Sequence, residues 1–189
     1  MLIVIPRKGP QISKETVLRR VRLRDIPLLV GLRTSEGIQA ELMAPQFSTS
    51  IIAALAWIYR SVRSRGRVFR VISVRRRRLG IGFLVVFLPE TSENAPLVGL
   101  AIKPNQQGKG VGAMAMNEAI QLSKNMGFET LRLSVRLDNP RARYLYESLG
   151  FTTVSRGTQT YFQGTCLSET MELNLGNWNG TMGPKAEAS

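Results

Sequence analysis

Apolar and polar residues follow one another along this chain in patterns that predict a succession of strands and helices. Alternation at a period of two over residues 16–23 predicts a strand, and a helix follows in "RDIPLLVGLR", with Asp25 as its N-cap and Pro27 in its first turn. Apolar residues at helical spacing within residues 47–62 predict a second helix. Its cap is one of Ser48, Thr49 and Ser50.

Three runs rich in Val, Ile and Phe come next, at residues 68–74, 79–88 and 95–102. They predict three neighbouring antiparallel strands. The first two are separated by "RRRR", residues 75–78, which we interpret as a hairpin turn.

The second half of the chain predicts a strand–helix–strand crossover. Residues 113–128 have helical periodicity and end at Gly127, which suits a C-terminal glycine cap, and "TLRLSV" then alternates as a strand. Asn139 caps a further helix, "PRARYLYESLG", which has Pro140 in its first position and Gly150 just beyond its end. Residues 153–163 and 168–175 predict two more strands.

The order of elements predicts a single domain of the α/β class (an α+β mixed sheet). Its N-terminal strands are largely antiparallel, and one strand–helix–strand crossover lies at its centre. We place the domain at residues 17–175, after an N-terminal extension of residues 1–16. Residues 176–189 have no periodicity and are expected to form a frayed tail.

Composition excludes several kinds of chemistry. The chain has no histidine, so histidine metal ligands, Ser-His triads and histidine general bases are ruled out. Its single cysteine, Cys166, rules out an intramolecular disulfide and a multi-cysteine metal site. We therefore expect no metal, and the remaining candidates are carboxylate, tyrosine, serine, lysine and backbone groups.

The net charge of +13 lies entirely in the first 80 residues, which carry 17 Lys or Arg against 4 Asp or Glu. Such a surface suits nucleic acid, an acidic protein or an anionic substrate, or it is an arginine-rich face in contact with solvent. The longest apolar stretches, residues 51–59 and 79–89, are shorter than the roughly 20 residues of a membrane-spanning helix. The first residues do not resemble a secretory signal, so we expect a cytoplasmic protein without membrane contact.

Glycines are concentrated in "KPNQQGKGVGAM", residues 103–114, between a predicted strand and a predicted helix. Backbone N–H groups in such a loop, together with the positive end of the helix dipole, suit a phosphate. A glycine turn without a ligand is one alternative. Another is a dinucleotide fingerprint made by Gly108, Gly110 and Ala113, with Asp138 as the ribose-binding acid. Against the fingerprint, "KPNQQ" separates the strand from the first glycine, and the chain has a single crossover where a dinucleotide fold has several.

A third interpretation takes in the neighbouring residues. Gln107, Gly110 and Gly112 fit the pattern Q/R-x-x-G-x-G/A, with "LAIKP" before it and "NPRARYLYESLGF" after it. This region resembles the GNAT superfamily of acyl-CoA-dependent N-acyltransferases, and its motifs are most similar to those of bacterial and archaeal N-acetyltransferases. The resemblance is strong over residues 97–152 and weaker over about 17–175. It implies one GNAT-like domain with splayed central strands and transfer of an acetyl group from acetyl-CoA to a primary amine by direct attack.

The resemblance also implies a cofactor site. Backbone groups of Leu100, Ala101 and Ile102 would bind the pantetheine arm, and one N–H would polarise the thioester carbonyl. The pyrophosphate would lie on the loop, which consists of Gln107, Gly108, Lys109, Gly110, Val111, Gly112 and Ala113. Lys109 either adds a charge near the phosphates or is solvated.

Two residues beyond the loop receive roles from the same resemblance. Asn139 would contact the CoA arm, which is compatible with its role as a helix cap. Tyr146 would be the general acid that protonates the departing CoA thiolate, and it would also contact the cofactor. Ala142, Leu145 and Leu149 share its predicted helix face.

The general base is not evident. Ser134 occupies the strand position at which ribosomal-protein N-terminal acetyltransferases of the family have a glutamate, and Glu41, Glu90 and Glu93 are other candidates on expected loops. A missing base favours an acceptor amine of low pKa. The basic N-terminal part favours an acidic acceptor or one presented on a ribonucleoprotein. The sequence is also compatible with a homodimer. The alternative function is a weak or inactive basic GNAT-fold module that binds RNA or a ribonucleoprotein.

Overall fold

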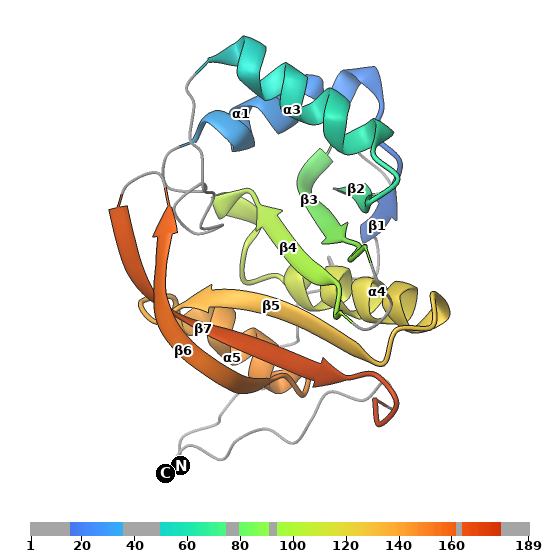
Figure 1. Cartoon of the computed structure of the whole chain (residues 1–189). Coiled ribbons are helices and arrows are strands. Elements are labelled where there is room, and N and C mark those ends of the chain that lie inside the picture. Colours follow the sequence, from blue (N-terminus) through green and yellow to red (C-terminus); the bar gives the residue numbers. More distant parts are fainter. Residues whose placement is uncertain (1–15, 36–49, 75–79, 91–93, 162–163, 179–189) are drawn as a thin grey trace, which may run out of the picture.

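One seven-stranded sheet runs through the protein, in the strand order β1-β2-β3-β4-β5-β7-β6 (Figure 1). The computed structural model describes residues 16–35, 50–74, 80–90, 94–161 and 164–178. The expected arginine turn at 75–78, together with Ser48, Thr49, Glu41 and Glu93, lies outside the described residues. The predicted mixed sheet in an α/β arrangement is confirmed.

The first four strands form an antiparallel half-sheet. They are β1 (Thr16–Arg19), β2 (Arg67–Val74), β3 (Gly80–Phe87) and β4 (Leu97–Ile102). The three antiparallel strands predicted from the Val- and Ile-rich runs are therefore confirmed. β3 is buried along almost its whole length because helices cover both of its faces, which explains its uninterrupted apolar sequence.

The other three strands form a second antiparallel half-sheet. They are β5 (Thr130–Arg136), β6 (Thr152–Tyr161) and β7 (Gly164–Asn174), with β7 between the other two. β7 begins at Gly164, earlier than the predicted start at residue 168. The reason is that residues 164–167 pair with residues 158–161 and extend the hairpin beyond the apolar part of the strand.

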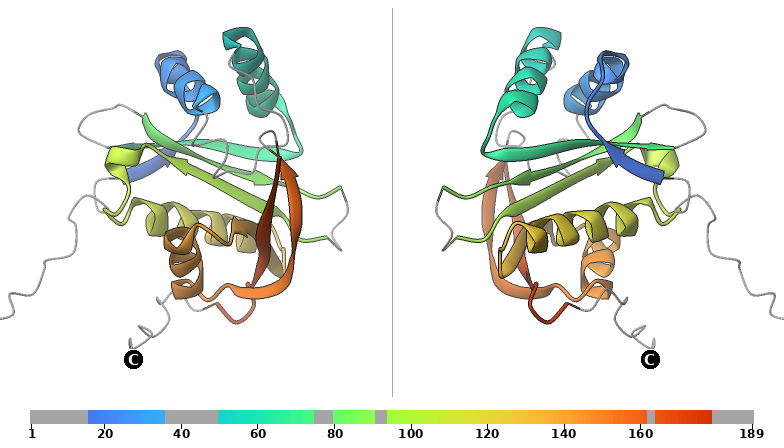
Figure 2. Two further views of the ribbon diagram at one scale, coloured as in Figure 1. Left: turned by 90° about the vertical axis from the view of Figure 1, so that its left-hand side faces the viewer. Right: turned by 90° about the vertical axis from the view of Figure 1, so that its right-hand side faces the viewer.

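Helices lie on both faces of the sheet (Figure 2). One face carries α1 (Ile26–Thr34) and α3 (Ile51–Arg63), and the other carries α4 (Val111–Asn125) and α5 (Pro140–Ser148). Short 3-10 turns, η2 (Leu23–Asp25) and η3 (Pro104–Gln106), precede α1 and follow β4. No helix in the described part of the chain has both the length and the apolar character needed to cross a membrane.

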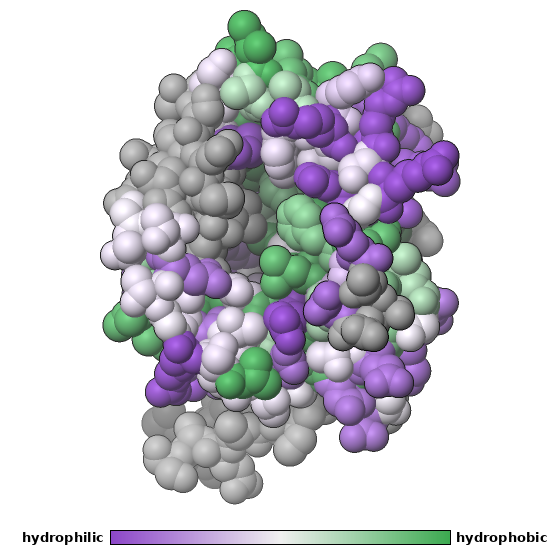
Figure 3. Space-filling view, in the orientation of Figure 1, coloured by the Kyte–Doolittle hydropathy of each residue, from purple (hydrophilic) through white to green (hydrophobic). Residues whose placement is uncertain are grey.

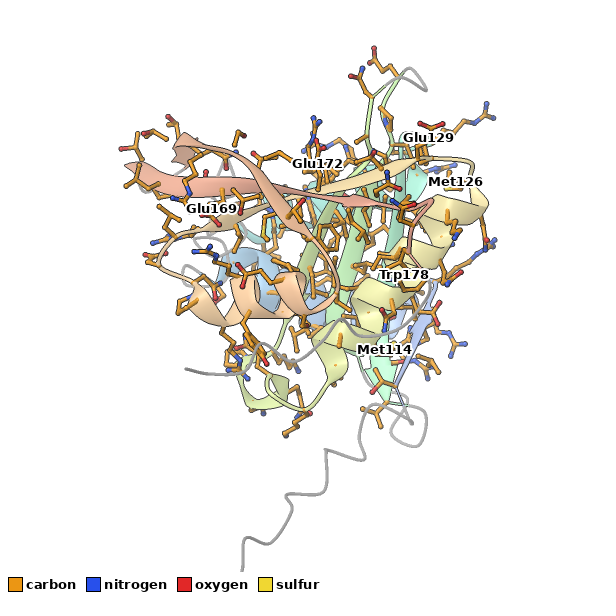
Figure 4. The ribbon with its side chains drawn as sticks, turned by 90° about the horizontal axis from the view of Figure 1, so that it is seen from below. Met114, Met126, Glu129, Glu169, Glu172 and Trp178 are labelled. Carbon is orange, nitrogen blue, oxygen red and sulfur yellow. The ribbon has the colours of Figure 1, made fainter. Side chains whose placement is uncertain are left out.

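Each helical layer has its own core. Under α1 and α3, the rings of Trp57, Phe69 and Phe83 lie with their centroids 5.4 to 5.6 Å apart, and such pairs add about 0.5–1.5 kcal/mol each beyond the burial of their area. Under α4 and α5, a larger core contains Met116, Ile120 and residues of β3, β5 and β7. Trp178, within the expected C-terminal tail, packs against this core beside α4 (Figure 4).

The helix ends follow local chemistry. Ser50 caps α3, because its Oγ accepts a hydrogen bond from the N–H of Ala53 at 3.4 Å. Asp25 stands at the predicted N-cap position of α1, but its carboxylate makes no cap bond there. It accepts two hydrogen bonds from the Arg19 guanidinium, at 2.6 and 2.7 Å, and one from the N–H of Arg22 at 2.8 Å. An ion pair between β1 and η2 therefore takes the place of the predicted helix cap.

Candidate active site

The two half-sheets meet at one narrow junction between β4 and β5. These strands are parallel, and within the described residues their ladder consists of a single pair, Leu97 with Arg132. The N–H of Arg132 donates to the carbonyl of Pro96 at 2.9 Å. Figure 1 shows the two strands starting side by side and then diverging, and Figure 3 shows a hollow near the middle of the same face. The predicted splayed strands are confirmed.

Beyond this junction no other described strand pairs with the edge of β4 that faces β5. On its other side the N–H of Lys103 donates to the carbonyl of Ile81 at 2.9 Å, in line with the antiparallel pairing of β4 with β3. Hydrogen-bonded pairs alternate along such a ladder, so Ala101 directs its backbone groups at β3. Leu100 and Ile102 direct theirs into the opening. Of the three residues predicted to bind pantetheine, Leu100 and Ile102 therefore direct backbone groups into the opening, whereas Ala101 directs its groups at β3.

The glycine loop lies directly beyond β4 and leads into α4. Gly108 and Gly110 have φ angles of +73° and +75°, a left-handed conformation that glycine adopts without a steric penalty. The first bond of α4 runs from the N–H of Met114 to the carbonyl of Gly110 at 3.1 Å. The N–H groups of Val111, Gly112 and Ala113 precede it and have no helical carbonyl to bond. They stand at the positive end of the helix dipole, where an anion is stabilised.

Side chains of the loop and of its neighbours hold it in place. The Nε2 of Gln107 donates to the carbonyl of Ile102 at 3.2 Å and so ties the loop to the end of β4. The Nζ of Lys109 donates to the carbonyl of Asn105 at 2.7 Å, so its ammonium group lies against η3. Lys109 thus adds positive charge beside the loop while it stabilises the turn.

The first turn of α4 meets both β4 and α5. A Cβ atom at Gly112 would lie 2.9 Å from Leu145 Cδ2, 3.7 Å from Ile102 Cδ1 and 3.8 Å from Leu100 Cδ2. A larger residue would have to displace the end of the Leu145 side chain, so glycine allows close packing of α5 on the loop. The contact brings α5 up to the end of the opening.

The helix α5 carries the residue predicted to be the general acid. Asn139 caps it, and Ala142, Leu145, Tyr146 and Leu149 all pack against the core beneath it, as the helical spacing predicts. Tyr146 is half-buried, and its ring centroid lies 6.0 Å from that of Phe151. Tyr146 is thus fixed on the helix that borders the glycine loop, and its catalytic role stays a prediction.

The strand position of the family's glutamate is polar but holds no carboxylate. Ser134 lies on β5 opposite Thr170, and its Oγ accepts a hydrogen bond from Gln159 Nε2 at 3.4 Å. The carboxylates of β7 and the one just after β5 are engaged by arginines: Glu169 pairs with Arg156, Glu172 with Arg132, and Asp138 with Arg136. Glu90 is exposed. No unpaired carboxylate therefore borders Ser134 in the described part of β5 and β7.

Two residues near the site were missed by the sequence interpretation. Glu169 is fully buried on β7 and pairs with Arg156 at 2.7 Å and with Arg143 of α5 at 3.3 Å (Figure 4). In the sequence, Glu169 stands two residues before Met171 and four before Leu173, so strand alternation places it on their buried face. The other is Arg141 in the first turn of α5, whose Nη1 donates to Gln107 Oε1 at 3.5 Å.

Comparison with known proteins places these features in a family. The model of the acetyltransferase (GNAT) family matches residues 57–151, which include β4, the glycine loop and α5. The [ribosomal protein bS18]-alanine N-acetyltransferase of Haemophilus influenzae is 42% identical over 62 residues, or 33% of this chain and 42% of that protein. The enzyme of the same name from Salmonella typhimurium is 38% identical over 74 residues, or 38% of this chain and 50% of that protein. The matches thus span about half the length of these relatives, or less.

Solved structures share the fold at low sequence identity. The spermidine N-acetyltransferase of Vibrio cholerae, in complex with CoA and spermine, superposes with a TM-score of 0.78 at 18% identity. The match covers 87% of this chain and 98% of that one. With half of the chain matched by the family model and the fold shared along its length, this chain belongs to the GNAT family of acetyltransferases.

Proposed function

We propose that the protein is an acetyl-CoA-dependent N-acetyltransferase that acetylates a primary amine by direct attack. The observation that carries this proposal is the opening between β4 and β5 directly beside the glycine loop. It offers a free strand edge for an amide-containing arm and unpaired N–H groups for a diphosphate. Pantetheine joined to a diphosphate has both of these parts.

The free edge of β4 fits the reaction. Leu100 and Ile102 would bond the pantetheine amides, and one of their N–H groups would donate to the thioester carbonyl oxygen. As the amine nitrogen attacks the carbonyl carbon, negative charge develops on that oxygen, and a fixed N–H stabilises it. The tetrahedral intermediate then collapses, the carbon–sulfur bond breaks and the thiolate of CoA leaves.

Tyr146 would give its proton to that thiolate, while the attacking nitrogen loses a proton to solvent water and the phenolate of Tyr146 takes one back from it. A phenol with a pKa of about 10 is protonated at neutral pH, and the thiol that it forms has a pKa of about 8.5, so transfer in the transition state costs little. The close packing of Leu145 of α5 against Gly112 of the loop would help to hold the hydroxyl near the bound thioester.

The acceptor is best matched by an α-amine. Because the carboxylates on β7 and just after β5 are paired with arginines, the described residues on this side of the opening offer neither a free base nor an acidic site for a polycation. At pH 7 a lysine amine with a pKa of about 10.4 costs about 3.5 kcal/mol more to deprotonate than an α-amine with a pKa of about 7.8. We therefore assign the N-terminal amine of a protein as the acceptor, rather than lysine or spermidine.

The first experiment tests the cofactor. Acetyl-CoA at about 100 times its dissociation constant should stabilise the fold by about 2.7 kcal/mol, which a thermal-shift assay detects. NADH and a short RNA serve as comparison ligands. Stabilisation by RNA alone would favour a binding module without turnover and would remove the proposed activity.

The second experiment tests the acceptor. Release of CoA thiol is measured with a peptide that has a free N-terminal alanine, with the same peptide blocked at its N-terminus and carrying a lysine, and with spermidine. We expect the free N-terminus to react fastest at pH 7, with a mass gain of one acetyl group on the terminal residue. Preference for spermidine at equal concentration would overturn the acceptor assignment and leave the transferase activity intact.

A further inference from the structure

A fully buried carboxylate joins α5 to the sheet (Figure 4). Glu169 of β7 has 0% of its surface exposed, and both of its carboxylate oxygens have partners. Oε1 accepts a hydrogen bond from Arg156 Nε of β6 at 2.7 Å, and Oε2 accepts one from Thr153 Oγ1 at 3.1 Å. Arg143 Nε of α5 lies 3.3 Å from the same Oε2. One side chain thus connects two strands with the helix that carries Tyr146.

Apolar burial contributes little to the position of α5. None of the nine residues of α5, all of which the structure describes, is buried, whereas α4 has six buried residues. Ala142, Leu145 and Tyr146 pack against the core with part of their surface exposed. Because the free energy of burial scales with the apolar area removed from water, such a helix can shift on the sheet at small cost. The ion pair between Arg143 and Glu169 adds a fixed point to this packing.

The place of Glu169 in β7 would suit an apolar residue. Strand alternation puts it on the same face as Met171 and Leu173, which both lie in the core. Burial of a charge costs free energy, and apolar side chains of similar volume are often as stabilising as a buried ion pair. Stability alone therefore does not account for a carboxylate here. A charged pair adds direction, because its short hydrogen bonds fix both partners.

The carboxylate stands on a firmly paired part of the sheet, close to the proposed acid. At Glu169 β7 is paired on both sides, with Val135 of β5 and with Arg156 of β6. Arg143 precedes Tyr146 by three positions, so the two are neighbours along the surface of α5. A displacement of Arg143 relative to β7 would therefore move the Tyr146 ring with it.

We propose that Glu169 is a positioning residue for the reaction: through Arg143 it holds α5 where the Tyr146 hydroxyl can reach the departing thiolate. The inference rests on the proposed function, in which Tyr146 is the general acid. Proton transfer requires the phenol oxygen and the sulfur at hydrogen-bond distance, and a displacement of about 1 Å can cost up to about 10²-fold in rate.

The test breaks the link from both ends. Glu169→Gln keeps the size of the side chain and removes its charge. Arg143→Gln removes the partner on α5 and leaves Glu169 bonded to Arg156 and Thr153, so the fold is not at risk. We expect each substitution to lower kcat about tenfold, with little change in KM for acetyl-CoA because the cofactor would be bound by the loop and β4. Arg143→Lys keeps a positive charge and should recover part of the loss.

The matched control is Glu147→Gln. Glu147 is exposed on α5 and pairs with the same Arg143 Nε at 2.9 Å, but it makes no link to β7. Its substitution removes an equal charge from the same helix and should leave kcat at the wild-type value.

A second measurement separates positioning from a general loss of structure. Glu169→Gln and Arg143→Gln are each combined with Tyr146→Phe. If Glu169 acts through the phenol, neither substitution lowers kcat further in the Tyr146→Phe background, whereas its effect on the melting temperature is the same in both backgrounds. If Glu169→Gln does not fold, Arg143→Gln decides the question alone.

The contrary outcomes have distinct meanings. An equal fold-loss of kcat in both backgrounds, or a wild-type kcat in Arg143→Gln, overturns the inference while the proposed function stands. If Tyr146→Phe keeps the full kcat, the phenol is not the acid and the inference falls, but the transferase activity remains. If the wild type releases no CoA thiol with any of the amines, the proposed function fails and the inference fails with it.

Discussion

Asn139 caps the helix that carries Tyr146, because its Oδ1 accepts a hydrogen bond from the N–H of Ala142 at 3.1 Å. Pro140 follows at the first helical position, where its fixed φ angle and missing N–H suit a helix start. The cap uses the oxygen of the amide, so the contact with the CoA arm that the family resemblance implies falls to the nitrogen. The two roles of Asn139 can therefore be separated by substitution.

Asn139→Asp keeps the capping oxygen and removes the N–H donor. We expect the melting temperature to stay within a few degrees of the wild type, and KM for acetyl-CoA to rise about tenfold, which corresponds to one lost hydrogen bond of about 1.4 kcal/mol. Asn139→Ala loses both groups and should also cost about 1 kcal/mol of stability. Thermal melts and steady-state kinetics check both variants. A wild-type KM in Asn139→Asp would leave Asn139 with the cap alone.

Tyr146→Phe removes the proposed acid and keeps the ring that packs near Phe151. We expect kcat to fall about 10²-fold, in the range typical of a lost general acid, with little change in KM for acetyl-CoA. Tyr144→Phe is the matched control, since Tyr144 lies on the same helix with 59% of its surface exposed. A similar loss in both variants, or none in either, would remove Tyr146 from the mechanism.

The pH dependence of the reaction should show that no general base of the protein deprotonates the acceptor amine. Without a general base, kcat/KM for an α-amine peptide should rise about tenfold per pH unit and level off near pH 7.8, the pKa of the free amine. Ser134→Glu places a carboxylate at the family's base position and should raise the rate at pH 7 and move the rise to lower pH. Ser134→Gln, similar in size and uncharged, should not. A wild-type profile that levels off well below pH 7 would indicate a base elsewhere.

The ion pair between Arg19 and Asp25 should make stability depend on pH. Burial alone would raise the pKa of the Asp25 carboxyl, but hydrogen bonds from Arg19 and Arg22 and the charges of Arg19 and Arg24 together hold it below its ordinary value. A lowered pKa in the folded state means that the stabilisation is complete well above about pH 4 and is lost as pH falls through the folded value.

Asp25→Asn should therefore lower the free energy of unfolding by about 3 kcal/mol at pH 7, since it removes the carboxylate charge that pairs with the largely buried guanidinium of Arg19. The difference from the wild type should shrink as pH falls below about 4. Urea titrations at a series of pH values check this, with Glu118→Gln as an exposed control on α4. A difference that does not vary with pH would mean that the effect of the substitution is steric.

Local patterns predicted the elements of this fold well because each depends on a few neighbouring residues. Gly127 and Gly150 end their helices with φ angles of +84° and +94°, as their places in the sequence predict. The motif around the glycine loop also located the opening beside β4. By contrast, whether Ala101 or Leu100 faces that opening depends on the register with β3, which the sequence of β4 alone does not contain.

The residues that were missed owe their roles to distant partners. Arg141 meets Gln107 across 34 positions, and nothing in "NPRARYLYES" marks it apart from Arg143, which is tied to carboxylates. Asp25 was expected to cap the helix that follows it. Its carboxylate instead accepts two hydrogen bonds from the Arg19 guanidinium, and this charged pair is stronger than a cap bond to a neutral N–H. In the second case the local preference for a helix cap gave way to an ion pair with the preceding strand.

The single pair between Leu97 and Arg132 also has a consequence for the folded chain as a whole. In the described residues the two half-sheets share very few hydrogen bonds there, and the core under α4 and α5, which contains residues of both, holds them together. Side-chain packing rather than the strand ladder therefore keeps this seam closed. A thioester bonded along β4 would act as a strand that the polypeptide does not supply. In a cell, the resistance of such a protein to proteases would then rise and fall with the supply of its own cofactor.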